Sequence, residues 1–296
     1  MKKLKLNLKP TIKKFELSAR KNTLSELSGK YLSLFKGKGL EFAGYRTYTY
    51  ADDSEEIDWK ASLRAGETLV KLMEEERNTK VYFLFDVGNS MLFASTNQLK
   101  CEYGAEVIAS ICFEILKAGD NAELIMFSDK INKIVPSRTG AEQYYRIVKE
   151  LSNPLNYGGN FDFTQILKYV DGYIPENSII IIVSDFIGLD NNWMTYFRIA
   201  AKRFDLVFAI MIRDPVDNNM PEDTGQIALE DPYSKTKLLV DPDGVSDSYA
   251  QRSYSIKQKI KEELLKCGCD TLELVTNKSF ERELSKFFVR SMRKWR

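Results

Sequence analysis

The feature that most constrains the fold is a series of short, continuous apolar runs that alternate with helical patterns after about residue 80. The densest run, Ser-Ile-Ile-Ile-Ile-Val at residues 178–183, is rich in β-branched side chains and has no polar alternation. Such a run is typical of a parallel strand that is buried on both faces of a sheet. We expect further strands at residues 81–86, 122–127, 205–212 and 271–275.

Helical periodicity fills the intervals between these runs. Apolar residues recur at helical spacing through residues 99–116, where Val107, Ile108, Ile111 and Ile115 share one face. Strands and helices in this alternation predict an α/β fold, namely a doubly wound, mostly parallel sheet with helices on both faces. The other expected helices span residues 141–151, 163–170, 191–202, 246–265 and 280–289.

Two segments interrupt the alternation. Residues 1–79 are rich in aromatic and charged side chains, and residues from about 213 to 243 contain turns and a short hairpin. A chain of 296 residues has room for one large domain or two smaller ones. We interpret residues 80–296 as the main domain, residues 1–79 as a segment that packs on it, and the hairpin as an excursion at the sheet edge.

The chain contains no histidine, which excludes several classes of site. Ser-His-Asp and Cys-His nucleophiles, helical His-Glu-x-x-His zinc sites and zinc fingers that need His are all ruled out. The cysteines are Cys101, Cys112, Cys267 and Cys269, and Cys267-Gly-Cys269 has no second pair with which to close a zinc site. We expect reduced thiols in a reducing compartment.

Charge and hydropathy exclude further classes of function. Lys and Arg number 43 against 42 Asp and Glu, so the net charge of +1 offers no general footprint for nucleic acid. The basic amino terminus is not followed by the apolar stretch of a secretory signal. The densest apolar run, residues 179–183, is far shorter than the roughly 20 residues of a membrane helix. We expect a cytoplasmic protein without direct membrane insertion.

Two carboxylates follow the most apolar strands. Asp86 ends the run at residues 81–86 and precedes Ser90, and Asp185 follows the run at residues 178–183. Ligands of doubly wound sheets bind at the carboxyl ends of strands, and carboxylate and hydroxyl oxygens suit Mg²⁺. The alternative is that Asp86 and Ser90 cap the next helix while Asp185 lies in a turn. The spacing leaves both interpretations open.

Charged and aromatic residues crowd residues 37–66. A glycosidase would need two positioned carboxylates with separated pKa values, which these acids could provide. Arg–carboxylate pairs in a structural or interaction subdomain explain the same composition. No Walker or Gly-x-Gly-x-x-Gly loop occurs, so ATP hydrolysis would have to come from a partner. The acids are Glu41, Asp52, Asp53, Glu55, Glu56 and Asp58, and the bases and aromatics among them are Arg46, Lys60, Arg64, Tyr45, Tyr48, Tyr50 and Trp59.

Part of this cluster carries a family resemblance. The chain resembles the domain of unknown function 58 family, whose von Willebrand factor A-like domain follows a family-specific N-terminal segment. Downstream matches are Ser184-Asp185-Phe186, Arg213-Asp214-Pro215 and Asp231-Pro232. The signature residues of the N-terminal segment include Glu41, Arg46, Asp52, Asp53, Asp58, Trp59 and Arg64.

The resemblance implies a metal-ion-dependent adhesion site. Asp86, Ser90 and Asp185 match its ligands, so Mg²⁺ or Mn²⁺ is the implied cofactor, with no cofactor as the alternative. Gly88 replaces the first serine of the motif, and Phe161 stands where a threonine is expected. With two hydroxyl ligands missing, a degenerate site of lower affinity is expected.

The resemblance also implies a function. Members of the family accompany MoxR-type AAA+ ATPases, so we expect a non-enzymatic adaptor or chaperone-like protein that binds such an ATPase and an unknown protein client. The alternatives are a carboxylate-based hydrolase that uses the Asp52–Asp58 cluster and a metal-independent scaffold.

Overall fold

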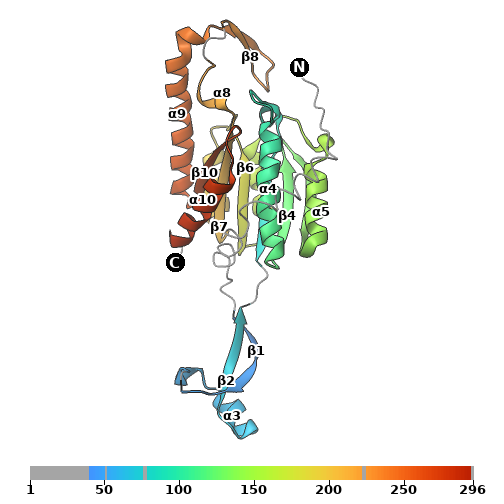
Figure 1. Cartoon of the computed structure of the whole chain (residues 1–296), viewed down its shortest axis with the longest axis vertical. Coiled ribbons are helices and arrows are strands. Elements are labelled where there is room, and N and C mark those ends of the chain that lie inside the picture. Colours follow the sequence, from blue (N-terminus) through green and yellow to red (C-terminus); the bar gives the residue numbers. More distant parts are fainter. Residues whose placement is uncertain (1–39, 51, 76–78, 222–224, 295–296) are drawn as a thin grey trace.

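The computed structural model describes residues 40–50, 52–75, 79–221 and 225–294. Its centre is a six-stranded sheet in the order β10-β7-β6-β3-β4-β5 (Figure 1). Neighbouring strands run parallel, except that β5 runs antiparallel to β4 at one edge. The strands are β3 (Lys80–Asp86), β4 (Asn121–Phe127), β5 (Ile131–Arg138), β6 (Ser178–Ser184), β7 (Leu206–Arg213) and β10 (Asp270–Val275).

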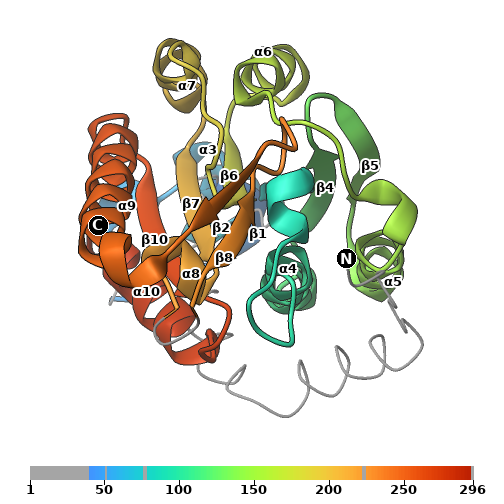
Figure 2. The same ribbon diagram turned by 90° about the horizontal axis from the view of Figure 1, so that it is seen from above.

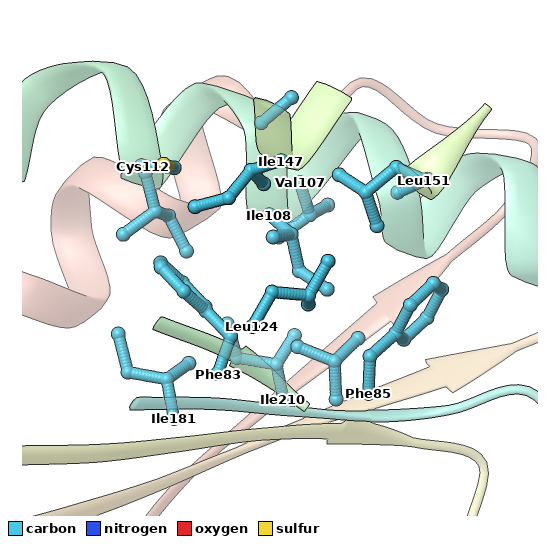
Figure 3. Close-up of a cluster of buried hydrophobic side chains, with 14 of the residues drawn as sticks. Phe83, Phe85, Val107, Ile108, Cys112, Leu124, Ile147, Leu151, Ile181 and Ile210 are labelled. Atoms are coloured by element: carbon cyan, nitrogen blue, oxygen red, sulfur yellow. The ribbon is translucent and has the colours of Figure 1, made fainter. Parts of the chain in front are cut away.

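Alternate residues of each central strand enter two separate cores. In β3, Phe83 and Phe85 pack with α4, α5 and α10, whereas Tyr82 and Leu84 pack with α6, α7 and α9. Figure 3 shows the first core, and Figure 2 shows helices on both sides of the sheet. This two-sided burial explains why β3 and β6 consist of continuous apolar runs. The helices are α4 (Lys100–Lys117), α5 (Gly140–Leu151), α6 (Phe163–Tyr173), α7 (Trp193–Ala201), α9 (Pro242–Lys266) and α10 (Glu281–Lys294).

Short elements connect this framework. The 3-10 turns η2 (Asn89–Leu92) and η3 (Pro154–Asn156) and the short helix α8 (Pro215–Asn218) lie in loops. Strands β8 (Ile227–Glu230) and β9 (Lys237–Val240) form an antiparallel hairpin at the carboxyl end of the sheet (Figure 1).

A small unit precedes the sheet. Strands β1 (Leu40–Thr47) and β2 (Leu69–Glu75) pair antiparallel, with the turn η1 (Ser54–Glu56) and helix α3 (Trp59–Ala65) between them. The five steps from Glu75 to Lys80 span at most about 18 Å, so β2 must end near the amino end of β3. The unit and the carboxyl ends of the strands are therefore at opposite ends of the sheet (Figure 1).

The predicted α/β fold, a von Willebrand factor A-like, doubly wound and mostly parallel sheet, is confirmed. The sequence analysis did not predict β5, which has partly exposed side chains and contains Pro136. Proline is tolerated at a sheet edge, where β5 lies, but it weakens the sequence signal of a strand. No helix in the described ranges is long and apolar enough to span a membrane. The division into residues 1–79 and 80–296 stays a prediction, because residues 1–39 and 76–78 lie outside the described part.

Candidate functional site at the carboxyl end of the sheet

The fold places Asp86, Ser90 and Asp185 side by side. Asp86 ends β3, Asp185 directly follows β6, and these two strands are parallel neighbours. Ser90 lies in η2, and its hydroxyl donates to Oδ1 of Asp185 over 3.2 Å. All three side chains are buried, Ser90 being the most exposed at 2%. The site is therefore closed to solvent.

Both carboxylate oxygens of Asp86 already accept hydrogen bonds. The Gly88 amide donates to Oδ1 over 2.8 Å, and the Ser184 hydroxyl donates to Oδ2 over 2.6 Å. A Cβ at Gly88 would lie 3.1 Å from Oδ1, so the missing side chain leaves room for this close turn. Burial and the nearby charge of Asp185 raise the pKa of Asp86 to about 7.

The structure adds a residue that the sequence analysis missed, Lys100. Its Nζ lies 2.7 Å from Oδ2 of Asp185 and 3.1 Å from Oδ2 of Asp217, and its side chain is only 1% exposed. Lys100 is the first residue of α4, a position that the helix dipole makes unfavourable for a cation. A lysine at the start of a largely apolar helix is thus the feature of the sequence that could have indicated an ion pair at this position.

The charge state of Lys100 follows from these two contacts. Burial alone would lower the pKa of the ammonium group, but the carboxylates of Asp185 and Asp217 outweigh it, and the net shift is upward. Lys100 is therefore a fixed positive charge beside Asp185. Asp217 in turn accepts from the Asp214 amide over 2.9 Å, which ties the loop after β7 into the same network.

The β8–β9 hairpin covers the site. Its Tyr233 hydroxyl donates to Oγ of Ser90 over 2.9 Å, and the Ile187 carbonyl oxygen, 3.1 Å from the same hydroxyl, is an alternative acceptor. The hairpin that was expected at the sheet edge thus contributes a side chain directly to the site.

The segment where the resemblance expects a threonine is aromatic instead. Phe161 packs 6.1 Å from the Phe163 ring and 6.3 Å from the Phe127 ring, measured between centroids. Thr164 lies in α6, and its buried hydroxyl has no hydrogen-bond partner among the described residues. The structure therefore shows no hydroxyl from this segment bound to Asp86 or Asp185.

These contacts bear on the implied divalent cation. Oδ1 of Asp185 accepts from Ser90 and from the Ile187 amide, and Oδ2 accepts from Lys100. With Asp86 also saturated, all four oxygens of the two carboxylates have donors from the chain itself. The described residues contain no group of three or more acids or cysteines arranged to hold a metal. While Lys100 binds Asp185, the carboxylate oxygens are not free to coordinate Mg²⁺ or Mn²⁺, so the residues present do not fit such an ion. The metal site remains a prediction.

The acidic residues of the family signature lie in the other unit, at the opposite end of the sheet. Arg46 makes two hydrogen bonds of 2.6 Å to Asp52, and these bonds hold the pKa of Asp52 well below its usual range. Asp53 accepts from the Glu55 amide at the start of η1. Arg46 and Asp52 thus form the bidentate pair of the structural interpretation.

The remaining signature residues surround α3. Asp58 caps this helix by accepting from the amides of Lys60 and Ala61, each over 3.1 Å, and these bonds together with that from Tyr45 lower its pKa. Trp59 is 65% exposed, and Arg64 lies in the last turn. Glu41 lies in β1, with its side chain outside the described part. Since Asp52 and Asp58 are both shifted toward ionisation, neither shows the raised pKa of a general acid.

Comparisons with known proteins place these observations in context. The model of the family described as "Protein of unknown function DUF58" matches residues 44–260, from β1 into α9. Uncharacterized proteins of Mycobacterium bovis and Mycobacterium tuberculosis are each 25% identical over 286 residues, which cover 95% of this chain and 88% of theirs.

Solved structures to which the chain is similar include the conserved hypothetical protein BatB from Bacteroides thetaiotaomicron. It has a TM-score of 0.49 and 15% identity, and the match covers 73% of this chain and 100% of BatB. An aerotolerance-related membrane protein from Bacteroides fragilis has a TM-score of 0.48 and 10% identity over the same shares of the two chains.

Proposed function

This chain belongs to the DUF58 family of proteins of unknown function, and from that premise we propose that it is a non-enzymatic adaptor or chaperone-like protein that works with a MoxR-type AAA+ ATPase. In this proposal it binds protein partners through the loops at the carboxyl end of its sheet. The ATPase supplies the hydrolysis, and an unidentified protein is the client.

The observation that carries the proposal is the contrast between a closed charged network and exposed apolar side chains on the hairpin above it. Asp86, Asp185 and Lys100 are all buried, and Lys100 is paired with Asp185, so these side chains are closed to a substrate in solution. On the hairpin at the same end of the sheet, Leu238 and Leu239 are 64% and 65% exposed. Exposed apolar residues on a soluble domain favour a protein-binding surface. This arrangement suits binding better than catalysis.

The location in the proposal is the cytoplasm, where an AAA+ ATPase has ATP. All four cysteines are free thiols, and Cys101, Cys112 and Cys269 are buried. Burial raises the pKa values of these three thiols, which leaves them poorly reactive. Free, unreactive cysteines are consistent with a reducing compartment.

The proposal is tested with purified chain and the purified MoxR-type ATPase of the same organism, with ATP, with ADP and without nucleotide. We expect saturable binding that the double change Leu238→Ser and Leu239→Ser weakens at least about tenfold, because each removes exposed apolar contact area. The control is Leu265→Ser, at a residue 56% exposed near the far end of α9. Absence of binding in every nucleotide state would remove the adaptor role.

A metal-independent scaffold is a second candidate, and Lys100 favours it. The ammonium group already neutralises Asp185, so the network needs no added cation to remain folded. If the chain binds its partners equally well in excess EDTA and in Mg²⁺, partner binding does not use a metal. Loss of binding in EDTA that Mg²⁺ restores would contradict this candidate.

A further inference from the structure

A second, separate feature lies beside the closed network. A cavity of about 660 Å³ opens between α7, α9 and the loop that follows β6. This volume falls in the range of about 300–1,000 Å³ that is common for small-ligand pockets. Neither Asp86, Ser90, Asp185 nor Lys100 lines it. The cavity therefore lies beside that network and shares Asp217 and Ile187 with its contacts.

Arg213, the last residue of β7, lines this cavity and is 6% exposed. Its Nε is buried without a hydrogen-bond partner, and Nη2 makes only a 3.5 Å contact with the sulfur of Met211. No carboxylate in the described part of the chain forms an ion pair with Arg213. A guanidinium group buried in this way is costly unless a partner neutralises it.

The acids around the cavity are already engaged. Asp217 binds Lys100, Glu263 pairs with Lys266 over 2.9 Å, and Asp190 accepts from the Asn192 amide. Two further cations, Arg252 and Lys259, line the cavity, and neither has an ion pair within the described ranges. Among the lining residues, three cations and one acid, Asp190, thus lack an ion pair, so the unmatched charge of the cavity is positive.

Helices α7 and α9 also give the cavity apolar lining residues. Trp193, Met194, Ile256 and Ile260 line the cavity, and Trp193 is 8% exposed whereas Ile256 is 52% exposed. A pocket with one buried guanidinium and an apolar wall suits a ligand that has one anionic end and an apolar body. Arg252 and Lys259 are exposed, so Arg213 is the one buried cation of the lining and matches a single anionic group.

We propose that this cavity binds a single carboxylate carried on an apolar chain, with the carboxylate on Arg213 and the chain against Trp193, Ile256 and Ile260. The chemistry fits both a free aliphatic carboxylate and the carboxyl terminus of a peptide that ends in an apolar residue. The site goes beyond the proposed partnership with an ATPase and does not depend on it.

The experiment titrates the full chain with two matched pairs of probes by calorimetry. Octanoate is compared with octanamide, and a short peptide that ends in Leu-Leu with a free carboxylate is compared with its amide. The proposal expects saturable binding of at least one carboxylate and none of the matched amide. Binding of octanoate identifies a free carboxylate as sufficient, and binding of the peptide alone identifies a peptide terminus.

Variants locate the binding. Arg213→Met should weaken carboxylate binding about 10- to 100-fold, because a charge-assisted hydrogen bond is lost. Ile256→Glu should also weaken carboxylate binding, because the new negative charge repels the ligand. Ile256 is 52% exposed, so this variant should fold even if Arg213→Met does not. Arg198→Met, at an exposed arginine on α7 outside the cavity, is the control and should change affinity less than about twofold. Equal binding of carboxylate and amide, no binding of either carboxylate, or binding unchanged by both cavity variants would overturn the proposal.

Discussion

The ammonium nitrogen of Lys100 lies 2.7 Å from Oδ2 of Asp185, and both side chains are buried at the carboxyl end of the sheet. The family resemblance implies a divalent cation at this aspartate, whereas the structure puts the ammonium group of Lys100 beside it. Lys100 also reaches Asp217, so one side chain joins the start of α4 to the segments that follow β6 and β7. The first three predictions below concern this network, and the other two concern helix packing and the small unit.

Replacing Lys100 with methionine should destabilise the fold. The change keeps most of the length of the side chain but removes the ammonium group, which leaves Asp185 and Asp217 without their cation. Breaking a buried ion pair from one side typically costs about 3–5 kcal/mol in the free energy of unfolding. Denaturant unfolding measures the loss. Lys117→Met, at the exposed end of the same helix, is the control, and equal small losses in both variants would contradict a special role for Lys100.

Divalent cations should not bind tightly to the wild-type site. Because Lys100 already holds Asp185, calorimetry with Mg²⁺ or Mn²⁺ should show no saturable binding below about 1 mM. The melting temperature should likewise be the same in EDTA and in Mg²⁺. Tight binding that Asp86→Ala abolishes would contradict this prediction and would identify Asp86 as a ligand.

Asp86 should make stability depend on pH. Burial raises the pKa of Asp86 to about 7 in the folded chain, against about 3.9 for an unfolded aspartate. The folded chain therefore keeps a proton that the unfolded chain loses, so this contribution is complete below about pH 4 and is lost as the pH rises to about 7.

The measurement is the free energy of unfolding of wild type and Asp86→Asn between pH 4 and pH 8. As the pH rises from 4 to 7, the wild type should lose stability relative to Asp86→Asn, because asparagine does not titrate. The free energy of unfolding of the variant minus that of the wild type should therefore increase, by at most about 1.4 kcal/mol per pH unit. The same substitution at exposed Asp247 should leave the pH profile of the wild type unchanged. Parallel profiles for wild type and Asp86→Asn would contradict the raised pKa.

Two helical glycines should respond to alanine in opposite directions. A Cβ at Gly104 in α4 would lie 2.9 Å from the Phe85 ring, so Gly104→Ala should destabilise by about 1–3 kcal/mol through overpacking. At Gly172 in α6 a Cβ meets nothing within 4 Å, so Gly172→Ala should stabilise by about 0.5–1 kcal/mol. Thermal unfolding of the pair tests the packing of α4 on β3, and a stabilised Gly104→Ala would show that it is looser than described.

Asp58 should act as a helix cap. Asp58→Ala removes the acceptor for the Lys60 and Ala61 amides, so their hydrogens should exchange faster, whereas asparagine caps as well as aspartate and should keep them protected. Amide hydrogen exchange measures both variants. A hydrolytic activity that Asp58→Asn abolishes while these amides stay protected would favour the carboxylate hydrolase instead.

The predictable part of the fold is the part that is buried on two faces. Strands β3, β6 and β7 must be apolar along their whole length because α4, α5 and α10 cover one face and α6, α7 and α9 cover the other. Strand β5 escaped prediction because an edge strand needs fewer apolar residues and tolerates Pro136.

The amino-acid sequence by itself determined the alternation of strands and helices and put Asp86 and Asp185 at strand ends, because burial periodicity and chain order are local properties. Only the tertiary structure decided what those acids meet. Lys100 is 85 positions from Asp185, and Tyr233 is 143 positions from Ser90. Arg213 faces a cavity whose wall comes from α9. Such contacts depend on how the helices and the hairpin pack over the sheet, and no sequence pattern encodes that packing locally.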